Sequence, residues 1–223
     1  MKTFKTFLNE GVNDPAIFKA IFLAGGPGSC KSFIVGKTGL TSMGYKVVNS
    51  DDAFENAMKK AGMEMSPDNI FSVKGQEIRG KAKNLTGVKQ AMYIKGRLGL
   101  VIDGTGKDPE KIANQAKELK KLGYDVAMIF VNTDVETAVK RDAARERTIG
   151  AEEATKYWKL VQRNIGKFQT MFGKKNFLVV DNSEGKDYKS ETLRAYRDAT
   201  KFTQAPVDNS KAKKWIKSEK SKK

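Results

Sequence analysis

The chain has 223 residues, which is enough for one substantial α/β domain but short for two full domains. It contains one cysteine and no histidine, which excludes an internal disulfide, a histidine-based catalytic triad and the usual zinc sites, so that any general base must be a carboxylate. The formal net charge of +16 favours phosphate-rich partners such as nucleotides, nucleic acid or anionic surfaces.

The N-terminal residues 1–16 are expected to form a partly packed arm that ends at Asp14. Phe4, Phe7 and Leu8 provide its apolar side chains. This stretch lacks the apolar block and cleavage site of a signal peptide, and no apolar run in the chain approaches the roughly 20 residues that span a bilayer. We therefore expect a cytoplasmic protein with no membrane partner.

A strand is predicted at 17–23, followed by a glycine-rich turn and by a helix from residue 32 to about residue 42. The order of strand, glycine-rich loop and Lys-Ser pair is typical of a loop that binds the phosphates of a nucleotide. Backbone N–H groups and the helix N-terminus would surround the phosphates. Lys31 would neutralise the β- and γ-phosphates, and the Ser32 hydroxyl would bind Mg²⁺.

One position of this loop departs from the usual pattern. Cys30 precedes the lysine, where the pattern has glycine, so a Cβ and a sulfur atom must fit where the backbone closes on the phosphates. The alternative interpretation is an ordinary glycine-rich turn between a strand and a helix. The expected nucleotide contacts are Gly26, Gly28, Ser29, Cys30, Lys31, Ser32 and Phe33.

The rest of the chain alternates between predicted strands and helices. Further strands are expected at 45–49, 98–103, 125–131 and 176–180. Helices are expected at 53–61, 109–122, 134–147, 152–172 and 189–202, with two more helices within 70–97. This alternation predicts a parallel sheet covered by helices.

Polar residues follow each predicted strand, at the edge where such sheets bind ligands. We therefore expect a binding site at this edge, independently of any motif. Besides the loop, the residues concerned are Asp51 and Asp52, Asp103 and Thr105, Asn132 and Thr133, and Asp181 and Asn182.

Four segments together resemble the polynucleotide kinase and zeta-toxin branch of the P-loop kinases, and in particular a zeta-toxin-like group of tailed bacteriophages. They are the loop, Asn-Ser-Asp-Asp at 49–52, Val-Ile-Asp-Gly-Thr at 101–105 and the arginine-rich stretch 140–147. The resemblance covers about 18–185. It implies an α/β P-loop kinase fold with a five-stranded parallel sheet in the order 2-3-1-4-5 and helices on both faces.

The resemblance also implies ATP and Mg²⁺ as cofactors, a kinase domain over residues 17–205 and a lid around 141–165. For a phage-encoded protein, the expected location is the host cytoplasm. The acid after the second strand would be the general base for an acceptor hydroxyl. Asp51 is favoured for this role and Asp52 for capping the following helix. The family usually has an arginine three residues beyond this acid, whereas this chain has Phe54 or Glu55 there.

Other roles follow from the same resemblance. Asp103 matches the acid that holds Mg²⁺, and Asn182 lies where related kinases place adenine. Arg141 and Arg145, four residues apart on one predicted helix face, would hold the transferred phosphoryl group. The alternative for these arginines is surface ion pairing. Contacts to the acceptor are expected from Asp51, Asp52, Thr105 and Arg147.

The predicted activity is transfer of phosphate from ATP to a hydroxyl. We expect this hydroxyl to belong to nucleic acid, because the chain is so basic. The acceptor would be a 5′-hydroxyl or a modified base of phage DNA. One alternative is a small-metabolite kinase acting on a nucleotide sugar or a nucleoside. Another is a nucleotide-gated binding protein whose catalysis is weakened by Cys30.

The basic residues gather in two regions. Cations at 70–97 would form either a binding surface or a solvated helix face. The tail at 206–223 would be either a disordered, solvated segment or a holder of nucleic acid, with Trp215 stacking on an unpaired base. The lysines of this tail are Lys211, Lys213, Lys214, Lys217, Lys220, Lys222 and Lys223.

Overall fold

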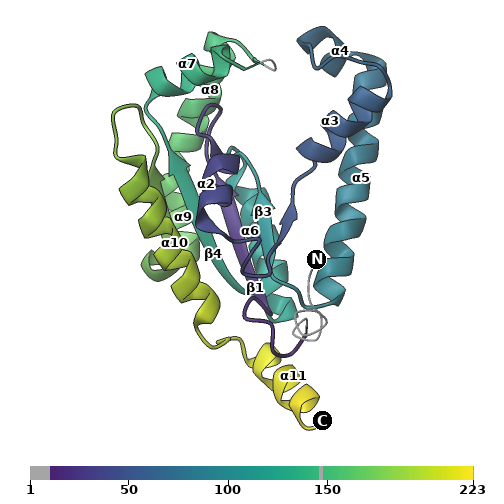
Figure 1. Cartoon of the computed structure of the whole chain (residues 1–223), viewed down its shortest axis with the longest axis vertical. Coiled ribbons are helices and arrows are strands. Elements are labelled where there is room, and N and C mark those ends of the chain that lie inside the picture. The colour runs from purple at the N-terminus through teal and green to yellow at the C-terminus, as the bar shows by residue number, and fades with distance from the viewer. Residues whose placement is uncertain (1–10, 146–147, 223) are drawn as a thin grey trace.

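The computed structural model describes residues 11–145 and 148–222, so most of the expected N-terminal arm lies outside the described residues (Figure 1). Within them, five parallel strands form one sheet in the order β2-β3-β1-β4-β5, as predicted. The strands are β1 (Lys19–Ala24), β2 (Lys46–Val48), β3 (Leu100–Asp103), β4 (Asp125–Asn132) and β5 (Phe177–Asp181).

Helices cover both faces of the sheet because successive strand residues alternate between two apolar clusters. Phe22 of β1 belongs to one cluster, with side chains from α6, α9 and α11, whereas Leu23 belongs to the other, with side chains from α2 and α10. No helix in the described ranges is long and apolar enough to cross a membrane. The helices are α2 (Lys31–Thr38), α3 (Asp51–Lys60), α4 (Pro67–Phe71), α5 (Val73–Lys95), α6 (Pro109–Leu122), α7 (Val135–Ala143), α8 (Ala151–Gln162), α9 (Ile165–Phe172), α10 (Tyr188–Gln204) and α11 (Ser210–Lys220), with a short 3₁₀ turn η1 (Lys174–Asn176).

The prediction of two helices within 70–97 is wrong, because α5 runs unbroken through three glycines. At Gly80 and Gly87 an added Cβ would meet nothing within 4 Å, so packing does not require glycine there. Each of these glycines lowers the stability of the helix by about 1 kcal/mol relative to alanine. At Gly75 a Cβ would lie 2.0 Å from the Asn69 carbonyl oxygen. Glycine at this position therefore allows α5 to start directly against α4.

The prediction of one helix over 152–172 is also wrong. The helix breaks between α8 and α9 at Asn164, a buried residue whose side-chain amide donates hydrogen bonds to the carbonyl oxygens of Gly106 and Lys107. Because a buried amide needs such partners, this break ties the α8–α9 region to the loop that follows β3.

The C-terminal segment is a packed helix, so the prediction of a disordered tail is wrong. Ala212 of α11 is fully buried, and the Trp215 ring lies edge-on to Phe18 at 5.5 Å between centroids. The Arg97 guanidinium lies 5.8 Å from the Trp215 ring. Trp215 thus extends the core, and its stacking on an unpaired base stays a prediction.

Replacing Trp215 with alanine is expected to lower the free energy of unfolding by about 2 kcal/mol, less than for a fully buried tryptophan because this ring is half-buried. Urea unfolding followed by circular dichroism would measure the change. Lys214→Ala is the matched control, since Lys214 is exposed on the same helix. An unchanged unfolding midpoint for Trp215→Ala would contradict the packing of α11.

Candidate active site

The glycine-rich loop joins β1 to α2 at the carboxyl edge of the sheet, as the sequence predicts (Figure 1). The Gly25 N–H donates to the Thr105 carbonyl oxygen (3.2 Å), and the Ser29 hydroxyl donates to the Gly26 carbonyl oxygen (2.8 Å). Gly28 has φ +69°, and a Cβ there would lie 2.3 Å from the backbone oxygen of Ala138. The loop is therefore held between β3 and α7, and only glycine fits at this contact.

Cys30 adopts the left-handed conformation that glycine favours, with φ 59° and ψ 43°, at the N-cap of α2. The conformation explains why the usual loop has glycine here, and it costs a residue with a Cβ about 1–2 kcal/mol. The thiol is exposed and lies 3.6 Å from the Gly28 carbonyl oxygen. The cysteine is thus accommodated in a backbone conformation that is strained for a residue with a Cβ.

Replacing Cys30 with glycine is expected to raise the free energy of unfolding by about 0.5–1 kcal/mol, since relief of strain exceeds the entropy that glycine adds to the unfolded chain. We also expect tighter ATP binding or faster turnover. Cys30→Ala is the control, because it removes the sulfur and keeps the strained backbone. Denaturant unfolding and ATP titration measure both effects, and lost turnover in Cys30→Gly would mean that the thiol acts positively.

Lys31 extends back along the loop and donates a hydrogen bond to the Gly25 carbonyl oxygen (2.8 Å). Burial lowers the pKa of Lys31, the Asp103 carboxylate opposes this shift, and Arg145 adds to it. Asp51 also acts to raise the pKa of Lys31. A partly desolvated ammonium group therefore lies among two carboxylates and an arginine at the edge of the sheet.

Asp103, at the end of β3, has one carboxylate oxygen in use and one without a partner. Its Oδ2 accepts a hydrogen bond from the Asn49 amide (3.0 Å), whereas its buried Oδ1 has no hydrogen-bond partner among the described residues. Burial raises the pKa of Asp103, Lys31 lowers it, and Asp51 and Asp52 raise it further. An orphaned, buried carboxylate oxygen beside a phosphate-binding loop fits a Mg²⁺ ligand, since Mg²⁺ prefers oxygen.

Asn49 is a site residue that the predicted set omits. Its amide N–H₂ holds Asp103, and its carbonyl oxygen accepts the backbone N–H of Asp51 (2.8 Å), so one side chain fixes both acids. The signal was present in the sequence, because the asparagine stands at the end of a strand, two residues before the first aspartate.

Asp51 and Asp52 occupy the first turn of α3, which starts two residues earlier than predicted. The prediction that one of them caps this helix is wrong, because Ser50 stands at the N-cap and makes no side-chain capping bond. Both side chains are exposed. The negative charge of Asp51 acts to raise the pKa of Lys31 as well as that of Asp103.

Arg141 and Asn182 hold the backbone of the loop from its far side. The Arg141 guanidinium donates to the carbonyl oxygens of Asn182 (2.8 Å) and Gly28 (3.4 Å). The buried Asn182 amide donates to the Ser29 carbonyl oxygen (3.0 Å). These contacts differ from the surface ion pairing that was the alternative for Arg141, and they join α7 and the segment after β5 to the loop.

Arg145 does not share a helix face with Arg141, because α7 ends at Ala143. That prediction is wrong, although Arg145 is close enough to lower the pKa of Lys31. The segment beyond α7 is anchored by buried Asp142, whose Oδ2 accepts the Thr148 hydroxyl (2.8 Å) and the Ile149 N–H (2.9 Å). The predicted acceptor contact Arg147 lies outside the described residues.

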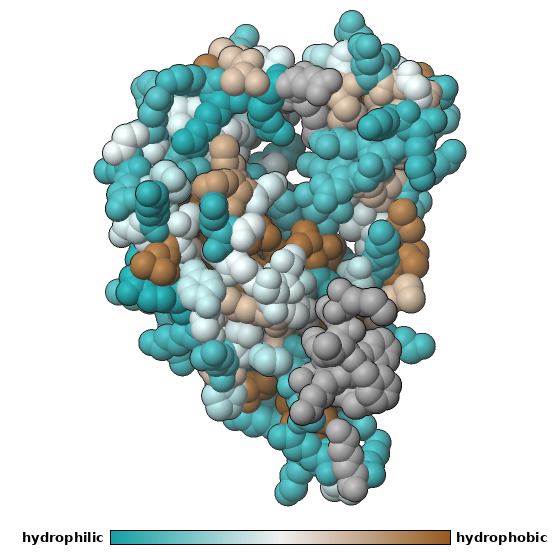
Figure 2. All heavy atoms as spheres, in the orientation of Figure 1, coloured by the Kyte–Doolittle hydropathy of each residue, from teal (hydrophilic) through white to brown (hydrophobic). Residues whose placement is uncertain are grey.

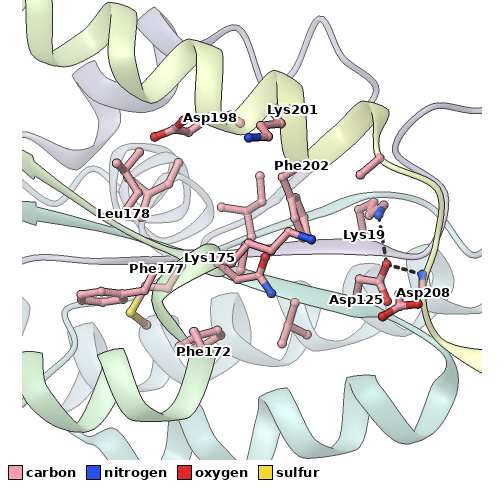
Figure 3. Close-up of a pocket in the computed structure, with 18 of the residues that line it drawn as sticks. Lys19, Asp125, Phe172, Lys175, Phe177, Leu178, Asp198, Lys201, Phe202 and Asp208 are labelled. Carbon is pink, nitrogen blue, oxygen red and sulfur yellow. Dashed lines mark hydrogen bonds and ion pairs between the residues drawn. The ribbon is translucent and has the colours of Figure 1, made fainter.

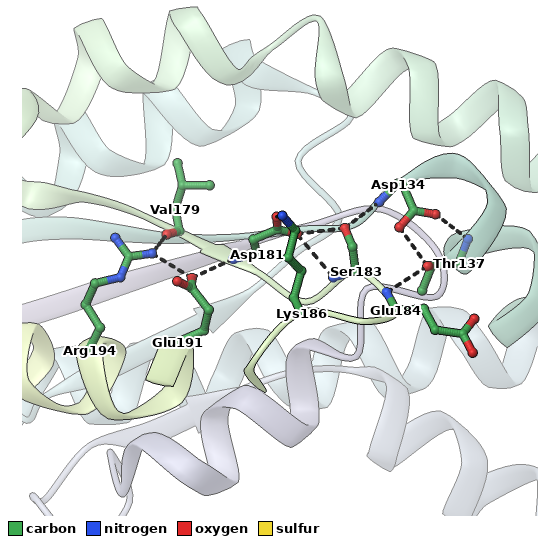
Figure 4. A network of polar contacts seen from close by, with 9 residues as sticks. All are labelled: Asp134, Thr137, Val179, Asp181, Ser183, Glu184, Lys186, Glu191 and Arg194. Atoms are coloured by element: carbon green, nitrogen blue, oxygen red, sulfur yellow. Dashed lines mark hydrogen bonds and ion pairs between the residues drawn. The ribbon is translucent and has the colours of Figure 1, made fainter. Parts of the chain in front are cut away.

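A polar network behind Asn182 fixes the segment after β5 to the start of α7 (Figure 4). The Ser183 hydroxyl donates to Asp181 (2.7 Å) and accepts the Asp134 N–H (2.9 Å), while the Glu184 N–H donates to the Thr137 hydroxyl (2.9 Å). Hydrogen bonds from the Thr137 backbone hold the pKa of Asp134 below its usual range. The network keeps the Asn182 and Arg141 contacts in place.

Aromatic side chains flank the loop, and most of them were not predicted. The exposed Phe33 ring lies edge-on to Tyr188 at 6.0 Å between centroids. Trp158 of α8 donates its indole N–H to the Thr133 carbonyl oxygen (2.7 Å), and its backbone is 3.6 Å from the position of a Cβ on Gly26. A flat ligand would therefore meet aromatic surface beside the loop.

The Zeta toxin family model matches residues 12–188. A search of curated proteins found no match. Among solved structures, a protein of Chloroflexus aurantiacus assigned as a kinase is similar, with 13% identity, a TM-score of 0.57 and coverage of 82% of this chain and 98% of that one.

The PezAT chromosomal toxin-antitoxin system of Streptococcus pneumoniae contains a similar chain, with 13% identity, a TM-score of 0.50 and coverage of 84% of this chain and 88% of that one. A chain of the Pnkp1/Rnl/Hen1 RNA repair complex is 21% identical over 67% of this chain, with a TM-score of 0.51, and the match covers 46% of it. Since the family model spans the loop, the sheet and α7 together, this chain belongs to the zeta toxin family of P-loop kinases.

Proposed function

We propose that the protein transfers the γ-phosphate of ATP to a hydroxyl group at the carboxyl edge of the sheet. The observation that carries the proposal is the orphaned Oδ1 of Asp103, buried beside Lys31 at the phosphate-binding loop. A charged, desolvated arrangement of this kind suits a ligand that brings both phosphates and a cation.

Loop backbone N–H groups, Lys31 and the N-terminus of α2 would bind the nucleotide phosphates. Arg141 uses one terminal nitrogen for both of its carbonyl contacts, so its other N–H donors stay available to the transferred phosphoryl group. Arg145 would add a second cation, and residues 141–165 would act as a lid. Phe33 and Asn182 would contact adenine.

Asp103 Oδ1 and the Ser32 hydroxyl are the oxygens that would hold Mg²⁺. The ion, when bound, would neutralise charge on the β- and γ-phosphates. Because the pKa of Asp103 is raised, this carboxyl group takes up a proton at higher pH than an ordinary aspartate. Cation binding should therefore weaken early as the solution is acidified.

Asp103→Asn is expected to weaken binding of Mn²⁺, a paramagnetic substitute for Mg²⁺, by at least tenfold in the presence of ADP, because the substitution removes a negative oxygen ligand. Electron paramagnetic resonance measures this binding without relying on turnover. Glu110→Gln, on the exposed first turn of α6, is the control for loss of one acid. Equal Mn²⁺ affinity in Asp103→Asn and the unmodified protein would contradict the assignment.

Asp51 would act as the general base, accepting the proton of the acceptor hydroxyl as its oxygen bonds to the γ-phosphorus and ADP leaves. Asp52 and Thr105 would help to position the acceptor. The Asn49 amide, by holding the Asp51 backbone, would position the base.

The acceptor that we favour is nucleic acid, either a 5′-hydroxyl or a modified base of phage DNA, because the net charge is +16. Exposed lysines of α11 would contribute phosphate contacts. A small-metabolite acceptor, such as a nucleotide sugar or a nucleoside, is the second candidate, supported by the family to which the chain belongs. A nucleotide-gated binding protein weakened by Cys30 is the non-catalytic alternative.

Radiolabelled ATP, incubated with DNA, RNA, nucleosides and nucleotide sugars in parallel, tests the proposal. Label should appear on one acceptor class and disappear when Lys31→Ala replaces the unmodified protein. Label on a nucleotide sugar alone would overturn the nucleic-acid acceptor. Nucleotide binding without transfer to any acceptor or to water would favour the binding protein.

A further inference from the structure

A cavity of about 700 Å³ lies at the amino ends of β1, β4 and β5, at the opposite edge of the sheet from the phosphate-binding loop (Figure 3). Residues 125–127 of β4 have no partner in β5, since Met128 pairs with Phe177, the first residue of β5. The amino-terminal part of β4 therefore faces open space, which η1 and the end of α10 enclose. The two edges are about 23 Å apart, from seven steps of 3.3 Å along β4.

The walls of the cavity provide apolar and aromatic surface that remains partly accessible. Phe177 and Leu178 come from β5, Phe172 from α9 and Phe202 from α10, and all four line the cavity. Phe177, Leu178 and Phe202 are half-buried and so keep part of their surface open to a ligand. Such a wall suits a flat, weakly polar ring.

Lys19 places a buried cation at the same cavity. Its side chain is 2% exposed, its ammonium group donates to Asp125 Oδ2 (3.0 Å), and it lies 4.9 Å from the Phe202 ring centroid. Asp125 also accepts the backbone N–H groups of Asp208 and Asn209. An ammonium group has three donors, and Asp125 is the one described acceptor, so two N–H bonds remain for an oxygen in the cavity.

Exposed lysines surround the opening, and within the described ranges none of them has an ion pair. In the view of Figure 3, Lys175 and Lys201 lie on the two sides of Phe202. Asp198 is the exposed acid nearest to them in sequence, whereas Asp208 is paired with Lys213 (3.1 Å). The lysines of the opening are Lys120, Lys174, Lys175 and Lys201.

We infer that this cavity is a second binding site, and that it takes a nucleotide unit. The base lies against Phe202 and Leu178, which belong to the same apolar cluster. An exocyclic oxygen of the base faces Lys19, and Lys175 and Lys201 bind the phosphate. Aromatic surface combined with a ring of cations is the chemistry that binds single-stranded nucleic acid. A free mononucleotide offers the same groups. The inference does not rest on the proposed function, because it uses no residue of the phosphate-binding loop.

Photo-crosslinking locates the site and separates the two sources of the ligand. The probes are 5-iodo-dUMP and an eight-nucleotide oligo(dT) with one internal 5-iodo-dU, each applied to the Lys31→Ala protein to suppress binding at the loop. We expect crosslinked peptides that contain Leu178 or Phe202. If only the oligonucleotide labels the cavity, the ligand is single-stranded nucleic acid. If both probes label it, a mononucleotide is sufficient for binding. Crosslinks confined to other regions, or none, would overturn the inference.

Affinity measurements test the contacts themselves. The double variant Lys175→Glu/Lys201→Glu should lower oligonucleotide affinity at least tenfold in fluorescence anisotropy and flatten its salt dependence. Lys59→Glu/Lys60→Glu, at the exposed end of α3, makes the same change in net charge outside the cavity lining, and should lower affinity less than threefold. Equal losses of affinity in the two double variants would mean that the oligonucleotide is held by general charge attraction, and would overturn the inference of a site in this cavity.

Phe202→Ala should lower affinity about tenfold through lost stacking, and Phe202→Tyr should restore it. If Phe202→Ala fails to fold, Phe202→Tyr and the two lysine double variants still test whether the cavity binds the oligonucleotide. Binding of ATP to the loop should be unchanged in every cavity variant, so failure of this site leaves the proposed kinase activity untouched.

Discussion

Replacing Lys31 with alanine is expected to reduce phosphoryl transfer by about a thousandfold or more. The ammonium group stands at the start of α2, directed along the loop to the Gly25 carbonyl oxygen, where it would bind the β- and γ-phosphates. Its loss removes a cation from the place where negative charge moves during transfer, and fixed charges there make large contributions to rate. Initial rates with radiolabelled ATP measure the effect.

The matched control is Lys117→Ala on α6, which removes one exposed lysine remote from the loop and should leave the rate unchanged. Burial lowers the pKa of Lys31, so the group loses its proton, and with it the attraction for phosphate, at lower pH than an ordinary lysine. ATP affinity should therefore decline as the pH is raised towards this lowered pKa. Unchanged turnover in a well-folded Lys31→Ala protein would contradict the site.

Replacing Asp51 with asparagine is expected to lower kcat by about 100- to 10,000-fold while leaving ATP affinity within about threefold. A general base acts on the acceptor and in the transition state, so its loss appears in kcat. The asparagine side chain keeps the size of the aspartate, and the Asn49 bond to the backbone of residue 51 is retained. Steady-state kinetics, with ATP binding measured by calorimetry, separates the two quantities.

Asp52→Asn is the comparison, since both acids lie exposed in the first turn of α3. A much smaller loss in Asp52→Asn would single out Asp51. Equal losses in the two variants would contradict the assignment of one base and indicate that the pair acts by charge alone. The electrostatic link from Asp51 to Lys31 is the structural reason for expecting the first outcome.

The sequence was sufficient for the sheet and for most of the edge that carries the site. The parallel sheet and the approach of Asp51, Asp103 and Asn182 to the loop follow from alternating strands and helices, because parallel strands bring their carboxyl ends together. The strand order came from the resemblance to the kinase family, and the structure has that order. Glycine misled the helix prediction at α5, because the helix continues through Gly80 and Gly87 despite their intrinsic cost, and only Gly75 is required by a close contact. Helix boundaries set by side-chain bonds, such as the break at Asn164, are not visible in periodicity.

Within the site, sequence patterns identified residue types but not their contacts. Arg141 was expected on phosphates, and the structure adds its bonds to the carbonyl oxygens of Gly28 and Asn182. Asn49 joins segments that are far apart in the chain, because its amide bonds to Asp103. The strain at Cys30 likewise comes from its left-handed backbone conformation. The sequence shows only that a cysteine stands where the loop pattern has glycine, and this alone does not establish the conformation. The cavity at the other edge has no motif, since its walls come from separate elements.

The packing of Trp215 on Phe18 joins the two ends of the described chain, since Phe18 directly precedes the first strand. A chain still being synthesised carries its first strand long before it carries α11. The cluster around Phe18 therefore stays incomplete until α11 has been made, with apolar surface exposed. Fragments of the chain that end before α11 should therefore expose this surface and depend on chaperones.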